Sequence, residues 1–165
     1  MGWMRRRRFS GSGTGEFVVR LPPAERDILA ALPDQLAALV ADGPSPVTVR
    51  LFPPAYGGDE ELDAEFQRLM GDELVRRRTE AAELVRDTIT KERLTEAELS
   101  AWVGVFNDVR LVLGTALDVS EQSDVLDVDP EAEDLPLRVT YVLLSEIVFD
   151  AVQALSGALP PPSRE

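Results

Sequence analysis

The chain has 165 residues, no cysteine and no histidine, and a formal net charge of −13. This length favours a single domain. The two missing residue types exclude thiol catalysis, disulfides, the serine–histidine–aspartate triad and the common catalytic zinc sites in this chain. Lys91 is its only lysine, so arginines and carboxylates are the main charged groups left for chemistry.

The charge is unevenly distributed along the chain. Residues 1–20 hold five arginines against Glu16, whereas the remaining residues hold 12 basic and 29 acidic groups. We expect residues 1–15 to form a flexible basic tail that ends in a glycine- and serine-rich linker. The acidic remainder would repel nucleic acid, so only a weak, salt-sensitive contact through the tail is expected. The arginines available for it are Arg5, Arg6, Arg7 and Arg8.

Two short segments, residues 17–21 and 47–51, have the β-type composition or the alternation of short strands. We expect them to pair as a minor two-stranded ribbon. Between them, apolar spacing predicts a helix after Pro22 and Pro23. Pro33 lies inside that helix and predicts a kink or a split.

Residues 59–90 are predicted to be helical but not continuous. Asp59 is a good N-cap for the first turn. The apolar stripe of the first half does not continue in line, because the stripe from Leu74 onward lies about a quarter-turn away. Gly71 and Asp72 fall where the stripe shifts. We therefore expect two helices here, or one sharply bent helix.

The next helix is predicted from unusually clear signals. Thr95 and Glu98 have the spacing of a capping box, and the helix should run to about Leu117. Its apolar residues cover nearly the whole circumference, so we expect it at the centre of a bundle or against a second subunit. An acidic loop follows over residues 118–134, and a last helix starts near Leu135.

These elements predict a mainly α fold, a single-domain bundle of about five helices with the minor two-stranded ribbon. The helical domain should span residues 16–159, and the proline-rich residues 160–165 should be disordered. No segment has an apolar run long enough to cross a membrane. The arginine-rich start is not followed by the apolar run of an export signal, so we expect a cytoplasmic protein.

Two segments carry a resemblance to a known family. They are Arg50-Leu-Phe-Pro-Pro-Ala-Tyr56 and residues 102–115, Trp-Val-Gly-Val-Phe-Asn-Asp-Val-Arg-Leu-Val-Leu-Gly-Thr. With the arginine-rich start, they resemble the actinobacterial domain-of-unknown-function family two-thousand-seventeen. The resemblance implies a small, mainly helical cytoplasmic protein, often encoded beside the adaptor of the Clp protease, with no established activity or catalytic residues. Some members are treated as redox-responsive transcriptional regulators through a cysteine pair, a mechanism that this cysteine-free chain cannot use.

Two arginines interrupt apolar helix faces. Arg78 and Arg110 must each reach solvent or meet a carboxylate, because an unpaired buried charge is very costly. One interpretation is a structural ion pair between helices. The other is an anion-binding pocket that also includes Arg50 and Asn107.

Two aromatic residues and an acidic run are further candidates. Phe52 and Tyr56 flank a Pro-Pro turn, where they either plug the edge of a core or contact a partner protein. The acidic run at residues 124–134 lacks the glycine and glutamate that a calcium loop needs at its sixth and twelfth positions. Histidine is missing for a di-metal carboxylate bundle. We therefore expect no metal and no cofactor.

The missing catalytic side chains favour a non-enzymatic protein-interaction or regulatory domain with an unknown protein partner. Homodimerisation through the helices around residues 102–117 and 137–155 is one form that this interaction can take. Two alternatives stay open. One is a sensor or enzyme that binds a small anion through arginines and carboxylates. The other is a DNA-binding transcriptional regulator, which the acidic charge disfavours.

Overall fold

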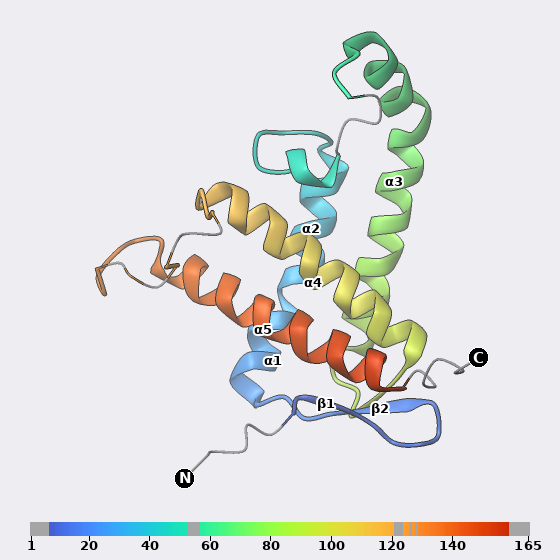
Figure 1. The fold of residues 1–165 in the computed structure, drawn as a ribbon, viewed down its shortest axis with the longest axis vertical. Helices are drawn as coiled ribbons and strands as arrows, with labels where there is room; N and C mark the ends of the chain where they lie inside the picture. The colour runs from blue at the N-terminus through green and yellow to red at the C-terminus, as the bar shows by residue number, and fades with distance from the viewer. Residues whose placement is uncertain (1–6, 53–56, 121–123, 126, 128, 159–165) are drawn as a thin grey trace, which may run out of the picture.

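Helices form most of the structure, and a small antiparallel sheet lies at one end (Figure 1). The helices are α1 (Pro23–Ala30), α2 (Leu32–Ala41), α3 (Glu60–Thr88), α4 (Glu96–Ala116) and α5 (Leu135–Ala158), with the short 3-10 helix η1 (Val49–Leu51). The strands β1 (Phe9–Gly11), β2 (Glu16–Val19) and β3 (Arg93–Thr95) follow the order β1-β2-β3. This computed structural model describes the chain except for residues 1–6, 53–56, 121–123, 126, 128 and 159–165. The predicted fold class, a helical bundle with a minor β part, is confirmed.

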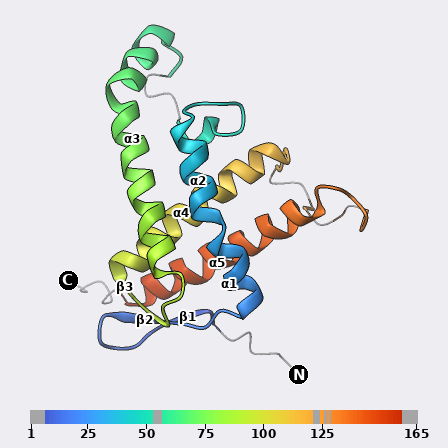
Figure 2. The ribbon, with the colours of Figure 1, turned by 180° about the vertical axis from the view of Figure 1, so that it is seen from behind.

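Helix α4 is the centre of the bundle, as its nearly all-round apolar sequence predicts. It packs against α2, α3 and α5 and also contacts η1 and the sheet (Figures 1 and 2). Trp102 and Phe106 are fully buried, and no large apolar side chain of α4 is exposed. The homodimer contact around residues 102–117 stays a prediction, with the large apolar side chains of α4 buried or half-buried.

The capping box predicted at the start of α4 is present. The backbone N–H of Glu98 donates to the Thr95 hydroxyl at 3.2 Å. The backbone N–H of Thr95 donates to the Glu98 carboxylate at 2.8 Å. Two otherwise unpaired donors of the first turn are thereby satisfied, which fixes the point where the chain leaves β3 and enters α4.

The sheet differs from the predicted two-stranded ribbon. Residues 47–51 form no strand, and η1 occupies the end of this segment. Strand β2 pairs instead with β1 on one side, where Phe9 is opposite Val19. On the other side it pairs with β3, where Phe17 is opposite Leu94. All four of these apolar side chains are buried, so the sheet closes the core.

The hairpin between β1 and β2 corrects the predicted flexible tail over residues 9–15, whereas residues 1–6 lie outside the described residues. Gly13 and Gly15 adopt φ values of +77° and +80°, which glycine tolerates without strain. The backbone N–H of Ser12 donates to the carbonyl oxygen of Glu16 at 2.9 Å across this turn. The glycine-rich stretch is therefore the turn of a hairpin and not a linker.

Helix α3 is one continuous helix of 29 residues, so the first of the two predicted forms, two separate helices, is wrong. Its C-terminal half faces the core through side chains such as Val85. Its first turns project beyond the other helices (Figure 1) and leave Leu62 and Leu69 exposed by 45% and 67%. The apolar stripe of the first half therefore does not face the core, whereas the stripe of the second half does.

The proline in the first helical region splits that region, as predicted. Helix α1 ends at Ala30 and α2 begins at Leu32, which places Pro33 in the first turn of α2. A proline is tolerated there, because the first N–H groups of a helix have no intrahelical acceptor. The described part of residues 118–134 contains no helix or strand, and α5 begins at Leu135 as expected.

Candidate functional site

Arg78 forms an interhelical ion pair, which was one of its two interpretations. Its Nε in α3 donates to Oδ2 of Asp108 in α4 at 3.0 Å. Both side chains are only about one-fifth exposed (22% and 20%). The guanidinium carbon also lies 5.7 Å from the centroid of the Phe52 ring, a cation–π geometry. Arg78 therefore connects α3, α4 and the residue that follows η1.

The burial of this ion pair predicts a specific pH dependence. Desolvation raises the pKa of Asp108, and the neighbouring Arg78 opposes the shift only in part. A carboxyl group whose folded-state pKa lies above its unfolded value stabilises the fold at low pH, and this stabilisation is lost as the pH rises through the folded-state pKa.

We expect Asp108→Asn, whose side chain does not titrate, to remove that component of the pH dependence. As the pH rises from about 3.5 towards neutral, the parent should lose stability relative to the Asp108→Asn variant. Urea unfolding of both proteins across this range measures the difference. A parent that gains stability relative to the variant as the pH rises would contradict the dominance of desolvation at Asp108.

A hollow of about 420 Å³ brings Arg50 and Arg110 together beside Tyr141 of α5. Arg50 belongs to η1 and Arg110 to α4. Nη2 of Arg110 donates to Oδ1 of Asn107 at 2.8 Å. Nε of Arg110 is buried and meets no acceptor in the part of the chain that the structure describes. Three of the four predicted anion-pocket residues therefore lie near one another, whereas Arg78 does not line this hollow.

The end of α4 positions one side of this hollow. Asp118 has a φ of +51°, the left-handed conformation that often ends a helix. The chain then turns back, and the backbone N–H of Val119 donates to the carbonyl oxygen of Gly114 at 2.9 Å. This turn places Val119 and Ser120 at the hollow together with Leu111.

Of the two aromatic residues predicted to contact a partner, Phe52 and Tyr56, the structure describes only Phe52. Phe52 is 7% exposed and packs in the core, so it is not an exposed contact for a partner. Its burial beneath the Arg78 guanidinium explains why an aromatic side chain suits the edge of the core here. Tyr56 lies outside the described residues.

Arg8 forms an ion-pair cluster that the sequence interpretation missed. Its Nε and Nη2 donate to the two carboxylate oxygens of Glu25 in α1 at 2.8 and 2.7 Å. In α5, Nη2 also reaches Glu146 at 3.2 Å, and Nη1 reaches Asp150 at 2.9 Å. The hydrogen bond to Glu25 raises the pKa of Arg8, against the opposing effect of burial. The Arg8 side chain is 11% exposed, so a largely buried guanidinium joins the chain just before β1 to α1 and α5.

A hairpin pattern was the signal that could have found Arg8. Two short apolar runs flank the glycine-rich stretch within residues 9–19, and this is a sequence pattern typical of a β-hairpin. Arg8 would then have been placed beside a strand and not in a tail. Of the other arginines proposed for nucleic-acid contact, Arg7 is exposed, and Arg5 and Arg6 lie outside the described residues.

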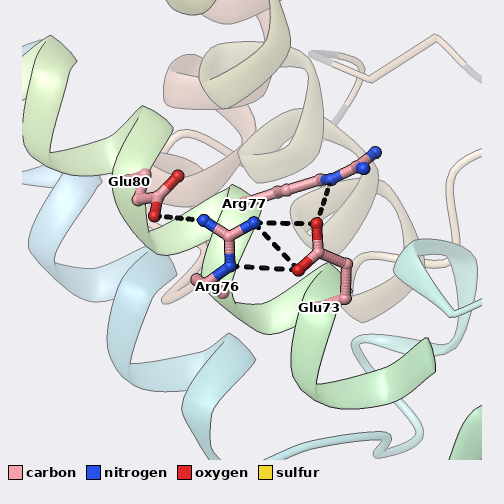
Figure 3. Close-up of polar contacts among 4 residues, drawn as sticks. All are labelled: Glu73, Arg76, Arg77 and Glu80. Carbon is pink, nitrogen blue, oxygen red and sulfur yellow. Dashed lines mark hydrogen bonds and ion pairs between the residues drawn. The ribbon is translucent and has the colours of Figure 1, made fainter. Parts of the chain in front are cut away.

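Exposed side chains of α3 form a polar network on the surface (Figure 3). Arg76 donates to both carboxylate oxygens of Glu73 and, at 2.5 Å, to Glu80. Nε of Arg77 donates to Glu73 at 2.7 Å. The Arg76 and Arg77 side chains are 56% and 70% exposed, and ion pairs this exposed contribute little to stability. The network is therefore a solvated helix surface and not a site.

Helix α5 carries an uncharged stripe on the side opposite its buried residues. Phe149 and Val152 lie on this stripe and are 62% and 41% exposed. Its members recur at alternating three- and four-residue spacing, and we call them the outer stripe: Val142, Ser145, Phe149, Val152 and Ser156. The nearby carboxylates of Glu146 and Asp150 are both bound by Arg8.

The described ranges contain neither a membrane-spanning helix nor a metal-binding cluster. No helix there has the length and apolar character needed to cross a bilayer. No cluster of three or more acidic, histidine or cysteine side chains there is suited to hold a metal ion. Within the acidic run at residues 124–134, Asp134 is instead bound by Arg138 of α5, and this hydrogen bond lowers the pKa of Asp134.

The match to a known protein family covers nearly the whole chain. The model of the Domain of unknown function DUF2017 matches residues 4–155. The chain belongs to this family. The match includes the sheet and all helices except the last residues of α5, so the family corresponds to the fold described above.

Curated relatives match over a shorter stretch. The oxidative stress regulators AosR of Mycobacterium bovis and of Mycobacterium tuberculosis (strain H37Rv) are each 32% identical to the chain over 71 residues. These matches cover 41% of this chain and 33% of each relative. The match thus spans about a third of the length of these regulators. No solved structure matches the chain.

Proposed function

We propose that this chain is a regulatory protein-interaction domain without catalytic activity, and that the outer stripe of α5 is its contact surface. The exposure of Phe149 and Val152 on an uncharged helix face carries this proposal. Single exposed apolar residues are common on soluble proteins, but apolar residues that gather on one face are typical of contact sites.

The regulatory part of the proposal is supported by the relatives. Two proteins that match part of the chain are named oxidative stress regulators. This chain contains no cysteine and so cannot sense oxidants through a thiol. A regulatory role would therefore act through the surfaces that the domain presents to other proteins.

The outer stripe is best suited to a second copy of this chain. Two copies with a net charge of −13 repel each other, so they can approach closely only where the surface is uncharged. Arg8 binds Glu146 and Asp150 next to the stripe and offsets part of their negative charge, which lowers the repulsion further. The alternating spacing suits helix–helix packing, and a two-fold contact pairs the same patch on both copies. The 24 residues of α5 span about 36 Å, long enough for an extended contact.

The assembly state of the purified chain tests the proposal. We expect sedimentation velocity to show a dimer at tens of micromolar, and Phe149→Glu to shift it to monomer because two like charges then face each other. Leu69→Glu is the matched control, since Leu69 is 67% exposed on α3, outside the outer stripe. It should leave the dimer intact.

Two results would overturn the proposal. One is a parent chain that stays monomeric up to hundreds of micromolar. The other is a dimer that survives Phe149→Glu. Thermal unfolding at low micromolar concentration should be similar for all three proteins, because both substituted side chains are mostly exposed.

A further inference from the structure

The hollow between η1, the end of α4 and α5 has the features of a ligand site. Arg50 and Arg110 line it with Tyr141, and the described residues around it include no carboxylate. We propose that this hollow binds a small organic molecule that carries a phosphoryl group. The site is separate from the outer stripe, so the two proposals can succeed or fail independently.

The charge environment of the two arginines is unusual in so acidic a chain. Acidic groups outnumber basic ones by 30 to 17. Arg20 and Arg26 donate to Ser10 and to backbone carbonyl oxygens instead of a carboxylate. Eight other arginines reach at least one carboxylate, namely Arg8, Arg68, Arg76, Arg77, Arg78, Arg86, Arg93 and Arg138. Within the described part of the chain, Arg50 and Arg110 form no ion pair, although they share one hollow. Two cations left without counter-ions at one place favour an anionic ligand.

The orientation of Arg110 is already fixed. Nη2 donates to Oδ1 of Asn107 one turn earlier in α4, at 2.8 Å. Nε is buried without an acceptor among the described residues. A buried donor without a partner is expensive, and a native structure usually satisfies it with a ligand or water. The free donors of Arg110 are thus held in place for an oxyanion.

Gly114 provides the room that brings the other two side chains to α4. A Cβ atom at this position would lie 3.2 Å from Cε2 of Tyr141 and 3.7 Å from Nη1 of Arg50. Glycine inside a helix is unfavourable, so its presence here needs a reason. The close approach of Tyr141 and of the Arg50 guanidinium to the backbone of α4 supplies that reason.

The lining of the hollow indicates the class of ligand. The arginine fork matches the geometry of phosphoryl oxygens, which two guanidinium groups can share. A volume of about 420 Å³ lies in the range of small-molecule pockets and exceeds what a bare ion fills. The ring of Tyr141 and the apolar side chains of Leu111 and Val119 provide a wall for an organic portion. A phosphate ester fits this lining, because its phosphoryl group can meet the two arginines and its aromatic or aliphatic group can meet the apolar wall.

Calorimetric titration with phenyl phosphate in low-chloride buffer tests this assignment. We expect saturable binding to the parent, and at least about tenfold weaker binding to Arg50→Gln and Arg110→Gln, since each removes one cation of the pair. Arg20→Gln is the matched control, because Arg20 is exposed beside the hairpin, donates to Ser10 and meets no carboxylate among the described residues. It should bind phenyl phosphate as the parent does.

A further variant and a second ligand extend the titration. Gly114→Ala should weaken binding by displacing Tyr141 and Arg50 while the two cations remain. Absence of saturable heat up to about 10 mM phenyl phosphate, or unchanged affinity in Arg50→Gln, would overturn the site. Inorganic phosphate that binds as tightly as phenyl phosphate would overturn the organic part of the ligand. If Arg110→Gln fails to fold, Arg50→Gln remains usable, because Arg50 is exposed.

Discussion

Replacing Trp102 with alanine should destabilise the chain by about 3–5 kcal/mol, the usual effect of removing a large buried aromatic side chain. Trp102 is fully buried in α4. Its ring meets Phe9 of β1 and Phe106 edge-on, with centroids 6.2 and 5.7 Å away. Its indole N–H donates to the hydroxyl of Thr88 at the end of α3, at 2.8 Å. One side chain therefore joins the sheet to two helices, and the truncation leaves a cavity where they meet.

Urea unfolding followed by far-ultraviolet circular dichroism measures the effect of Trp102→Ala. The control is Trp102→Phe, which keeps a ring but loses the hydrogen bond to Thr88. The Thr88 hydroxyl would still donate to the carbonyl oxygen of Leu84, so this variant should lose about 1–2 kcal/mol. A loss below about 1 kcal/mol for Trp102→Ala would contradict the central position of α4.

The helices were predictable where local signals set their ends. The capping box at Thr95 and Glu98 and the split at Pro33 need only neighbouring residues, and both occur as predicted. The central position of α4 was also predictable, because a helix that is apolar nearly all round must be covered nearly all round. These inferences succeed because a helix end or a helix face is a property of a short segment.

The segment at residues 47–51 shows why a strand pattern can fail. The hydroxyl of Thr48 accepts a hydrogen bond from the backbone N–H of Ser45 at 2.8 Å and lies 3.1 Å from the carbonyl oxygen of Gly43, to which it can donate. Such local bonds compete with strand pairing and stabilise a turn. Leu51 and the next residue, Phe52, are both buried, which a strand with one core-facing side could not achieve.

The misjudged break in α3 has a different cause. The shift between its two apolar stripes is real, but it does not mark a break between two helices. The first stripe instead lies on turns that project beyond the bundle, where Leu62 and Leu69 stay exposed. Helical periodicity shows which residues share a face, but it does not show which face meets the core.

The candidate site was predictable only in its residue types. An arginine on an apolar face must find a partner, and Arg78 finds Asp108 as one interpretation required. The meeting of Arg50 with Arg110 depends on how η1 packs against α4, and no local pattern encodes that contact. The same limit hid the cluster around Arg8, whose partners lie 17, 138 and 142 positions along the chain.

Replacing Arg8 with methionine should destabilise the chain by about 3 kcal/mol, the lower end for breaking a buried ion pair by removing one partner. The lower end applies because the carboxylates of Glu25, Glu146 and Asp150 are 20–33% exposed. Without the guanidinium, these negative groups repel one another where α1 and α5 meet the chain just before β1. Thermal unfolding at neutral pH measures the loss.

The pH dependence of the loss distinguishes repulsion from lost packing. In the Arg8→Met protein, the repulsion exists only while the carboxylates are charged, so the deficit relative to the parent should shrink as the pH falls from about 7 towards 4. Arg76→Met is the matched control: it also removes a guanidinium bound to carboxylates, but from the exposed surface of α3 (Figure 3). Its melting temperature should equal that of the parent, because exposed ion pairs contribute little. Equal melting temperatures for the two variants, or a deficit at Arg8 that does not change with pH, would show that Arg8 does not hold the hairpin to the helices through charge.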